Sequence, residues 1–202
     1  MTVATSRTGT QPVIPTKLAH FVIRTNQFEK LLAWYRTVFH ARTAYENPVI
    51  AFLTYDDEHH RFAFLNTAHL PKPDQMYTGF DHVAFTYASL PDLLANYERL
   101  KGEGIVPFWC INHGPTTSMY YRDPDGNELE FQVENYGSLE EAGAFFYSDA
   151  FNANPIGVDF NPDDMLAKLR SGTPVTELLK QGAAPVAPGT EHVFTTLPPP
   201  PG

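Results

Sequence analysis

Apolar and polar positions follow the same order twice along the chain. In the first half, alternating apolar side chains predict a strand over 17–24, and apolar residues at helical spacing predict a helix over 27–39, with Asn26 as its N-cap. Three short runs, 41–46, 49–55 and 61–66, are separated by turn residues and are predicted as strands. The order is therefore one strand, one helix and three strands.

This order returns after a Pro-rich connector. A strand is predicted over 80–87, a helix over 90–101, and strands over 105–111, 116–122 and 127–133. The opening phrases A-H-F-V-I and D-H-V-A-F place His82 62 positions after His20. We therefore predict an α+β fold of two tandem βαβββ modules, which pair through their faces and form a half-open barrel cup.

The predicted modules set the domain boundaries. Residues 1–16 are interpreted as an N-terminal arm, and residues 17–135 as a catalytic domain of modules 17–66 and 80–135, joined by the connector 67–79. Residues 136–202 are a C-terminal extension with short helices at 162–171 and 174–180 and an irregular, Pro-rich end. We expect the extension to wrap its own subunit or a neighbour in preference to a direct part in catalysis.

Composition narrows the class of protein. The 202 residues are 43% hydrophobic, enough for one core or two small repeated cores. The net charge of -9 disfavours nucleic acid and anionic membranes as partners. The single cysteine, Cys110, excludes an intramolecular disulfide and is expected to be a small buried residue. No run has the length of a membrane span and the first residues lack the apolar core of a signal peptide, so a cytoplasmic location is expected.

One hairpin, residues 111–130, gathers side chains suited to chemistry. Its two strands are joined by the turn 123–126, Asp-Pro-Asp-Gly, whose residues turn formation explains. Alternation allows Tyr120 and Glu130 to face the same concavity, and His113 lies on the same hairpin. Glu130 stands between apolar neighbours on its strand, where an unpaired charge is costly and a bound metal would resolve that cost.

These residues resemble a known family. A His on the first strand of each module and a Glu on the last strand are similar to the vicinal oxygen chelate superfamily. The hairpin also resembles the signature of type I extradiol catechol dioxygenases. The resemblance as a whole covers about residues 17–135. The matching elements are His113, Met119-Tyr120, Asp123-Pro124-Asp125-Gly126 and Glu130.

The resemblance implies a non-haem metal, Fe(II) or Mn(II), held by His20, His82 and Glu130. Two imidazoles and one carboxylate leave open positions, which oxygen chemistry needs. The last strand of the first module, 61–66, contains no acid, so the fourth ligand of a glyoxalase-like site is missing. Either histidine alone would be read as structural, but equivalent placement in two modules favours a ligand role.

The resemblance also implies roles around the metal. His60 would be the acid-base group, while His113 and Tyr120 would hydrogen-bond substrate oxygens. His59 and His60 are neighbours and would point to opposite sides of a strand, so at most one of them can face the cup. The resemblance favours His60, and His59 is left as a surface residue or one that supports the site from behind. His69, on the connector, is a candidate for lining the entrance.

We therefore expect an extradiol ring-cleaving dioxygenase that inserts both atoms of O2 into a catechol-type aromatic, in aromatic hydrocarbon catabolism, as a homo-oligomer. Two alternatives stay open. One is a metal-dependent transferase or isomerase of the same superfamily, such as a glutathione or thiol transferase or a glyoxalase-like enzyme. The other is a metal-free protein that binds an aromatic ligand. The ring substituents, the metal and the position of cleavage are left open by the sequence.

Overall fold

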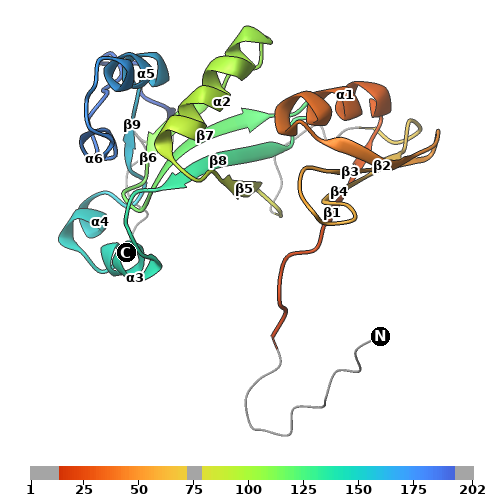
Figure 1. Ribbon diagram of the computed structural model, residues 1–202, viewed down its shortest axis with the longest axis horizontal. Coiled ribbons are helices and arrows are strands. Elements are labelled where there is room, and N and C mark those ends of the chain that lie inside the picture. Colours follow the sequence, from red (N-terminus) through yellow and green to blue (C-terminus); the bar gives the residue numbers. More distant parts are fainter. Residues whose placement is uncertain (1–13, 72–78, 194–202) are drawn as a thin grey trace, which may run out of the picture. The chain divides into compact units, whose positions relative to one another are not determined.

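The computed structural model describes residues 14–71 and 79–193, which form two compact units that divide at Leu70 and Pro71 (Figure 1). Most of the predicted arm 1–16, the centre of the predicted connector 67–79 and the Pro-rich end of the extension lie outside the described residues. Within the described ranges, no helix combines the length and the apolar character that a membrane crossing requires.

The first unit is a four-stranded sheet with one helix. Its strands stand in the order β1-β4-β3-β2, with β1 parallel to β4 and the other pairs antiparallel. The elements are β1 (Phe21–Thr25), α1 (Phe28–Phe39), β2 (Arg42–Glu46), β3 (Ile50–Thr54) and β4 (Phe62–Asn66).

Helix α1 covers one face of this sheet. Its residues Leu31, Leu32 and Tyr35 are fully buried, and the Tyr35 ring lies 5.1 Å from the ring of Phe62 and 4.8 Å from that of Phe64. Such edge-to-face aromatic contacts add to the burial that holds a helix on a sheet. The helical spacing seen in the sequence therefore corresponds to a packed face.

The predicted cap of α1 is wrong. The N-cap is Gln27, whose side chain makes no capping hydrogen bond, and the Asn26 amide donates to the carbonyl oxygen of Leu70 instead. The Asn26 side chain, which could have capped the helix, bonds Leu70 at the end of the first unit instead. The helix is held by its packing on the sheet. The helix ends at Phe39, and its C-cap, His40, adopts a left-handed conformation with φ of 49°.

The second unit repeats this topology, which confirms the α+β class and the predicted βαβββ repeat. Its sheet has the order β5-β8-β7-β6-β9, with β5 parallel to β8. The first four strands correspond to β1-β4-β3-β2. The elements are β5 (His82–Thr86), α2 (Leu90–Gly102), β6 (Trp109–Asn112), β7 (Thr116–Arg122) and β8 (Glu128–Glu134).

Alternation along the strands separates a core face from an open face. Tyr121, Leu129 and Phe131 are buried at 1% exposure or less on the face that packs against α2. Tyr120 and Glu130, opposite each other in the β7–β8 register, belong to the other face. Cys110 is buried as predicted, and burial raises the pKa of its thiol.

The C-terminal extension adds a strand to the second sheet. Its elements are α3 (Leu139–Phe145), α4 (Asp149–Ala153), β9 (Val158–Asp159), α5 (Pro162–Arg170) and α6 (Val175–Leu178). Strand β9 runs antiparallel along β6, as Figure 1 shows. The helices predicted at 162–171 and 174–180 correspond to α5 and α6, whereas α3, α4 and β9 were not predicted. Asp163 of α5 bonds Tyr97 and Lys101 of α2, so the extension packs on its own unit.

Asn112 joins the end of β6 to the extension. Only 2% of it is exposed, and its Nδ2 donates to the carbonyl oxygen of Leu179 at 2.8 Å. Its Oδ1 accepts from the Gly114 amide at 2.9 Å and from Asn135 Nδ2 at 3.1 Å. Its own carbonyl oxygen accepts from Gln181 at 3.0 Å. The buried side-chain amide of Asn112 thus makes hydrogen bonds to three separate segments of the chain.

We predict that Asn112→Ala lowers the free energy of unfolding by about 2 to 3 kcal/mol, because it leaves buried donors and acceptors without partners. Urea unfolding followed by circular dichroism measures this change. Asn26→Ala, which removes one exposed hydrogen bond, is the control and should cost less than about 0.5 kcal/mol. Equal effects of the two substitutions would contradict the assigned role of Asn112.

Candidate active site

Neighbouring strands of the second unit align four side-chain positions in one row. Trp109 on β6 lies opposite Tyr120 on β7, which lies opposite Glu130 on β8, which lies opposite Ala84 on β5. Directly opposed residues project to the same face of a sheet. His82 stands two residues before Ala84 and therefore shares that face. The register thus brings two predicted metal ligands and one predicted catalytic residue together.

Glu130 is a buried carboxylate with a histidine partner. It is 5% exposed, and its Oε2 lies 3.0 Å from His82 Nε2. Burial raises the pKa of Glu130, but hydrogen bonds from His82 and Ser118 outweigh burial, and the net shift of its pKa is downward. Its carboxylate is therefore ionised at neutral pH.

His82 lies between two carboxylates. Its Nδ1 is 2.6 Å from the Asp81 carboxylate, and its Nε2 faces Glu130. The hydrogen bond with Glu130, reinforced by that with Asp81 and opposed by burial, raises the pKa of His82 to about 9. A positive charge is therefore favoured at this point of the sheet.

These two residues fit a metal cation. A cation that displaces the His82 proton would meet the same negative surroundings, and metal binding to imidazole requires such proton loss. Asp81 holds Nδ1 and leaves Nε2 for a metal, the arrangement common around metal-bound histidines. Among residues 14–71 and 79–193, however, no three His, Cys, Asp or Glu side chains lie together in a group that could hold a metal ion. The third predicted ligand, His20, belongs to the first unit, so the complete triad stays a prediction.

His113 and Tyr120 form a hydrogen-bonded pair. His113 Nε2 lies 3.0 Å from the Tyr120 hydroxyl, and His113 Nδ1 lies 2.5 Å from the carbonyl oxygen of Ile156. Tyr120 is 5% exposed, and burial together with the negative charge of Glu130 raises the pKa of its hydroxyl. Tyr120 is therefore a neutral phenol that can exchange hydrogen bonds without losing its proton.

Trp109 was missed in the sequence. Its ring stacks on Tyr120 at 4.9 Å and on His192 at 4.6 Å, and its indole N–H donates to Asp159 at 2.9 Å. The backbone amide of His192 also donates to Asp159. Counting the hairpin register back from Tyr120 would have found Trp109, because the two are directly opposed. No pattern in the extension marks Asp159 or His192.

In the first unit, His20 and His60 lie together. Their ring centroids are 4.3 Å apart, and His60 also stacks on Phe52 at 4.7 Å. Burial, followed by electrostatic interactions with His20 and His59, lowers the pKa of His60 in spite of the opposing charge of Glu58. His60 is therefore held neutral, the form in which an imidazole can accept a proton.

The prediction that His59 and His60 point to opposite sides is wrong. Their ring centroids are 4.4 Å apart and their Nδ1 atoms 2.5 Å apart. The physical reason is that they lie in a bend before β4, which begins at Phe62, and strict alternation holds only in extended strands.

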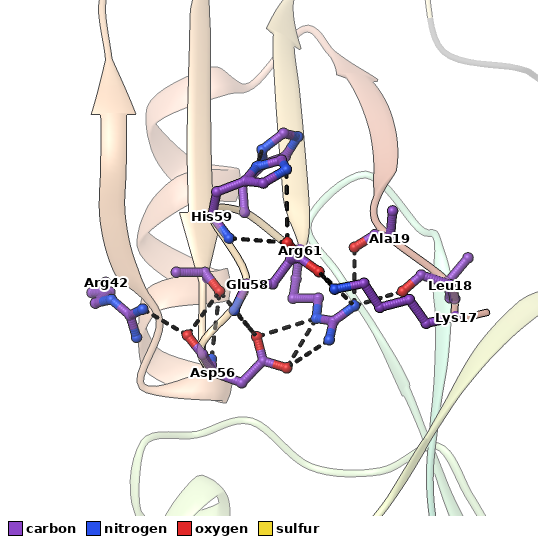
Figure 2. Close-up of polar contacts among 10 residues, drawn as sticks. Lys17, Leu18, Ala19, Arg42, Asp56, Glu58, His59 and Arg61 are labelled. Atoms are coloured by element: carbon purple, nitrogen blue, oxygen red, sulfur yellow. Dashed lines mark hydrogen bonds and ion pairs between the residues drawn. The ribbon is translucent and has the colours of Figure 1, made fainter. Parts of the chain in front are cut away.

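Arg61 holds the bend that carries these histidines (Figure 2). Its Nε donates to the Asp56 carboxylate at 2.9 and 3.1 Å, and its Nη1 donates to the carbonyl oxygens of Leu18 at 2.6 Å and Ala19 at 3.0 Å. The latter segment leads directly into His20. One guanidinium therefore ties the His60 bend to the backbone before His20.

The register also locates the position equivalent to Glu130 in the first unit. Val22 pairs with Ala63 in the parallel β1–β4 ladder, as Ala84 pairs with Glu130 in the β5–β8 ladder. Val22 and Ala84 each stand two residues after the first histidine of their unit. Ala63, 3% exposed, therefore occupies the place where a four-ligand site would need a carboxylate.

The remaining histidines stand elsewhere in their units. His40 forms the left-handed end of α1, and His69 is exposed in a turn after β4. His192 stacks on Trp109.

Two proteins of Rhodococcus globerulus are similar to this chain over most of its length. Biphenyl-2,3-diol 1,2-dioxygenase 2 is 42% identical over 163 residues, which cover 80% of this chain and 86% of that protein. Biphenyl-2,3-diol 1,2-dioxygenase 3 is 41% identical over 164 residues, with the same coverage of 80% and 86%.

A solved structure and a family profile give the same assignment of the fold. A fosfomycin resistance protein from Listeria monocytogenes, 20% identical, superposes with a TM-score of 0.50 over 64% of this chain and 99% of that chain. The profile of the Glyoxalase/Bleomycin resistance protein/Dioxygenase superfamily matches residues 17–131. The similarity to the first Rhodococcus protein spans 163 residues, so it extends into the C-terminal extension, residues 136–202, even if it begins at the first residue of the chain. The chain belongs to the Glyoxalase/Bleomycin resistance protein/Dioxygenase superfamily.

Proposed function

We propose that this protein is an extradiol dioxygenase that opens a catechol-type ring with both atoms of O2. The observation that carries the proposal is the His113–Tyr120 pair on the same sheet face as the His82–Glu130 pair. One pair suits a metal and the other suits the oxygens of a bound aromatic diol. The activity in the names of the two Rhodococcus relatives makes biphenyl-2,3-diol the first substrate to test.

We propose that His20, His82 and Glu130 hold the metal, with Fe(II) first and Mn(II) second. The two histidines occupy equivalent places, since His20 immediately precedes β1 and His82 begins β5. When bound, Fe(II) supplies Lewis acidity for two adjacent oxygens and an open position for dioxygen. Glu130 contributes an ionised oxygen, and His82 contributes Nε2 once its proton has left.

His60 is the proposed acid-base residue. Its lowered pKa keeps it neutral, so it can take a proton from a catechol hydroxyl and return it later. Its Nδ1 faces Nδ1 of His59, which leaves Nε2 as the nitrogen that exchanges the proton. Tyr120 and His113 orient the substrate oxygens through their paired hydrogen bonds.

The alternatives have less support. A glyoxalase-like isomerase with four ligands needs a carboxylate where Ala63 stands, and a thiol transferase has no evident use for the His113–Tyr120 pair. A metal-free binding protein has no evident use for an ionised, buried Glu130 facing His82.

A homo-oligomer remains part of the proposal. Strand β2 lies at the edge of the first sheet, and all five of its residues are exposed. An exposed edge offers unpaired backbone groups to a second copy.

Oxygen uptake tests the function. Protein loaded anaerobically with Fe(II) is expected to consume oxygen in equal amount to added biphenyl-2,3-diol or another catechol, with a yellow ring-opened product. Removal of iron with a chelator should abolish uptake, and Fe(II) should restore it. Protein that binds one equivalent of iron and consumes no oxygen with any catechol would refute the proposal.

Equilibrium dialysis tests the ligands. His20→Ala and Glu130→Gln should each weaken Fe(II) binding by at least about 100-fold, because each removes a direct ligand, while Asp81→Asn should weaken it by about 10-fold through His82. His40→Ala, at the end of α1, is the control and should bind as the wild type does. Unchanged affinity in either ligand variant would remove that residue from the metal site.

Arg61→Ala should lower kcat by about 10- to 100-fold, because the His60 bend and the segment before His20 lose their common support. Arg36→Ala is the matched control, since Arg36 likewise bonds a carboxylate, that of Glu46, and donates to the Thr43 hydroxyl at the surface of the first unit. Steady-state oxygen consumption measures both variants. Equal losses would show that Arg61 acts only through general stability.

A further inference from the structure

The C-terminal extension contacts the proposed catalytic pair through one backbone oxygen. The carbonyl oxygen of Ile156 lies 2.5 Å from His113 Nδ1. A carbonyl oxygen can only accept, so Nδ1 carries the hydrogen. In the neutral imidazole, Nε2 then has none, and it accepts from the Tyr120 hydroxyl 3.0 Å away. The hydrogen bonds form a chain that runs from Tyr120 through His113 to Ile156.

The position of the Ile156 carbonyl is fixed by the turn 154–157. Gly157 has φ of +121°, and a Cβ atom there would lie 2.4 Å from the Asn112 carbonyl oxygen and 2.8 Å from the Cα of His113. Only glycine permits this approach. Asn154 closes the turn, because its Nδ2 donates to the Gly157 carbonyl oxygen at 2.7 Å and its Oδ1 accepts from the amides of Ile156 and Gly157 at 3.2 and 3.0 Å.

We propose that the turn 154–157 sets the direction of the hydrogen bonds from Tyr120 through His113 to Ile156. Tyr120 then presents an oxygen lone pair to the substrate and selects the catechol oxygen that keeps its proton. The catechol in this statement rests on the proposed function. Tyr120 is the group that touches the substrate, because both ring nitrogens of His113 are already engaged. His113 and the turn act through Tyr120 as positioning elements.

The donors and acceptors of the Tyr120 hydroxyl explain why it would select one catechol oxygen. Tyr120 has one hydrogen and two lone pairs, and its hydrogen goes to His113, so toward the substrate it can only accept. With the other tautomer, His113 Nε2 would donate to Tyr120, and the hydroxyl hydrogen would turn to the substrate and favour an ionised oxygen. The tautomer of one ring thus decides which oxygen the site prefers.

Glu130 is a competing acceptor for the Tyr120 hydrogen. If that hydrogen went to Glu130 while His113 was neutral, lone pairs of Nε2 and the hydroxyl oxygen would face each other at 3.0 Å. Such an arrangement is repulsive, so the hydrogen goes to His113. The stacking of Trp109, held by Asp159 of the extension, keeps the Tyr120 ring in place for this bond.

The ring nitrogens of His113 report the tautomer directly. We expect 15N spectra of histidine-labelled, metal-free full-length protein at mildly alkaline pH to show Nδ1 protonated and Nε2 unprotonated, far downfield, with His113→Gln used for assignment. Gly157→Ala should shift this ring toward the Nε2–H form. Gly172→Ala is the matched control, because it has φ of +91° in the same extension and a Cβ there meets no atom within 4 Å.

Asn154→Ala gives a second test that adds no atoms, should Gly157→Ala fail to fold. It should produce the same change at His113, whereas Asn161→Ala, which removes the N-cap of α5 elsewhere in the extension, should leave the ring unchanged. In iron-loaded protein, Asn154→Ala should lower kcat by about 10-fold, since the substrate oxygens are then misaligned.

The outcomes separate the two proposals. A wild-type ring protonated at Nε2, no change in Gly157→Ala and Asn154→Ala, or an equal change in the two controls would overturn the role of the turn. The expected tautomer in a protein that consumes no oxygen with catechols would overturn the proposed function and leave the direction of the chain supported. Both expected changes, with unchanged controls and loss of kcat, would establish the inference.

Discussion

A carboxylate buried on a β-strand is the constraint on which the site depends. Glu130 is 5% exposed, and an ionised group in such a place is costly unless charge and hydrogen bonds surround it. His82 and Ser118 provide that compensation, and the parallel pairing of β5 with β8 places His82 on the same face. Strand register, more than any single contact, therefore determines the chemistry available on this face.

Duplication followed by divergence explains the difference between the units. Both have the same strand order, yet Ala63 stands where the second unit has Glu130. The connection before the last strand has also diverged. In the second unit Asp123 accepts a hydrogen bond from Asn127 at 2.8 Å and closes a tight turn, whereas in the first unit a longer bend, held by Arg61, carries two histidines. One unit carries the carboxylate, and the other carries the acid-base candidate.

The sequence predicted those features that local pattern and repetition determine. The strand 116–122 and the helix beginning at Leu90 agree with the structure because long alternating or helical runs follow one period. Alternation along the hairpin predicted a common face for Tyr120 and Glu130, and their direct pairing between β7 and β8 agrees with this. Alternation failed for His59 and His60, since a bend has no fixed period. Strand β9 and the contact of Ile156 with His113 could not be predicted, because they depend on tertiary contacts between segments with no repeat to align.

The location of the single cysteine has a consequence for a protein that is proposed to handle dioxygen. Cys110 neighbours Trp109 in β6 but projects to the opposite face, and burial raises the pKa of its thiol. Oxidation of a cysteine requires a thiolate and access, and Cys110 offers neither. Met119 and Met165, at 0% and 1% exposure, are equally enclosed. In the described part of the chain, the sulfur atoms of these three residues are thus enclosed by the fold, which shields them from oxidants dissolved in the solvent.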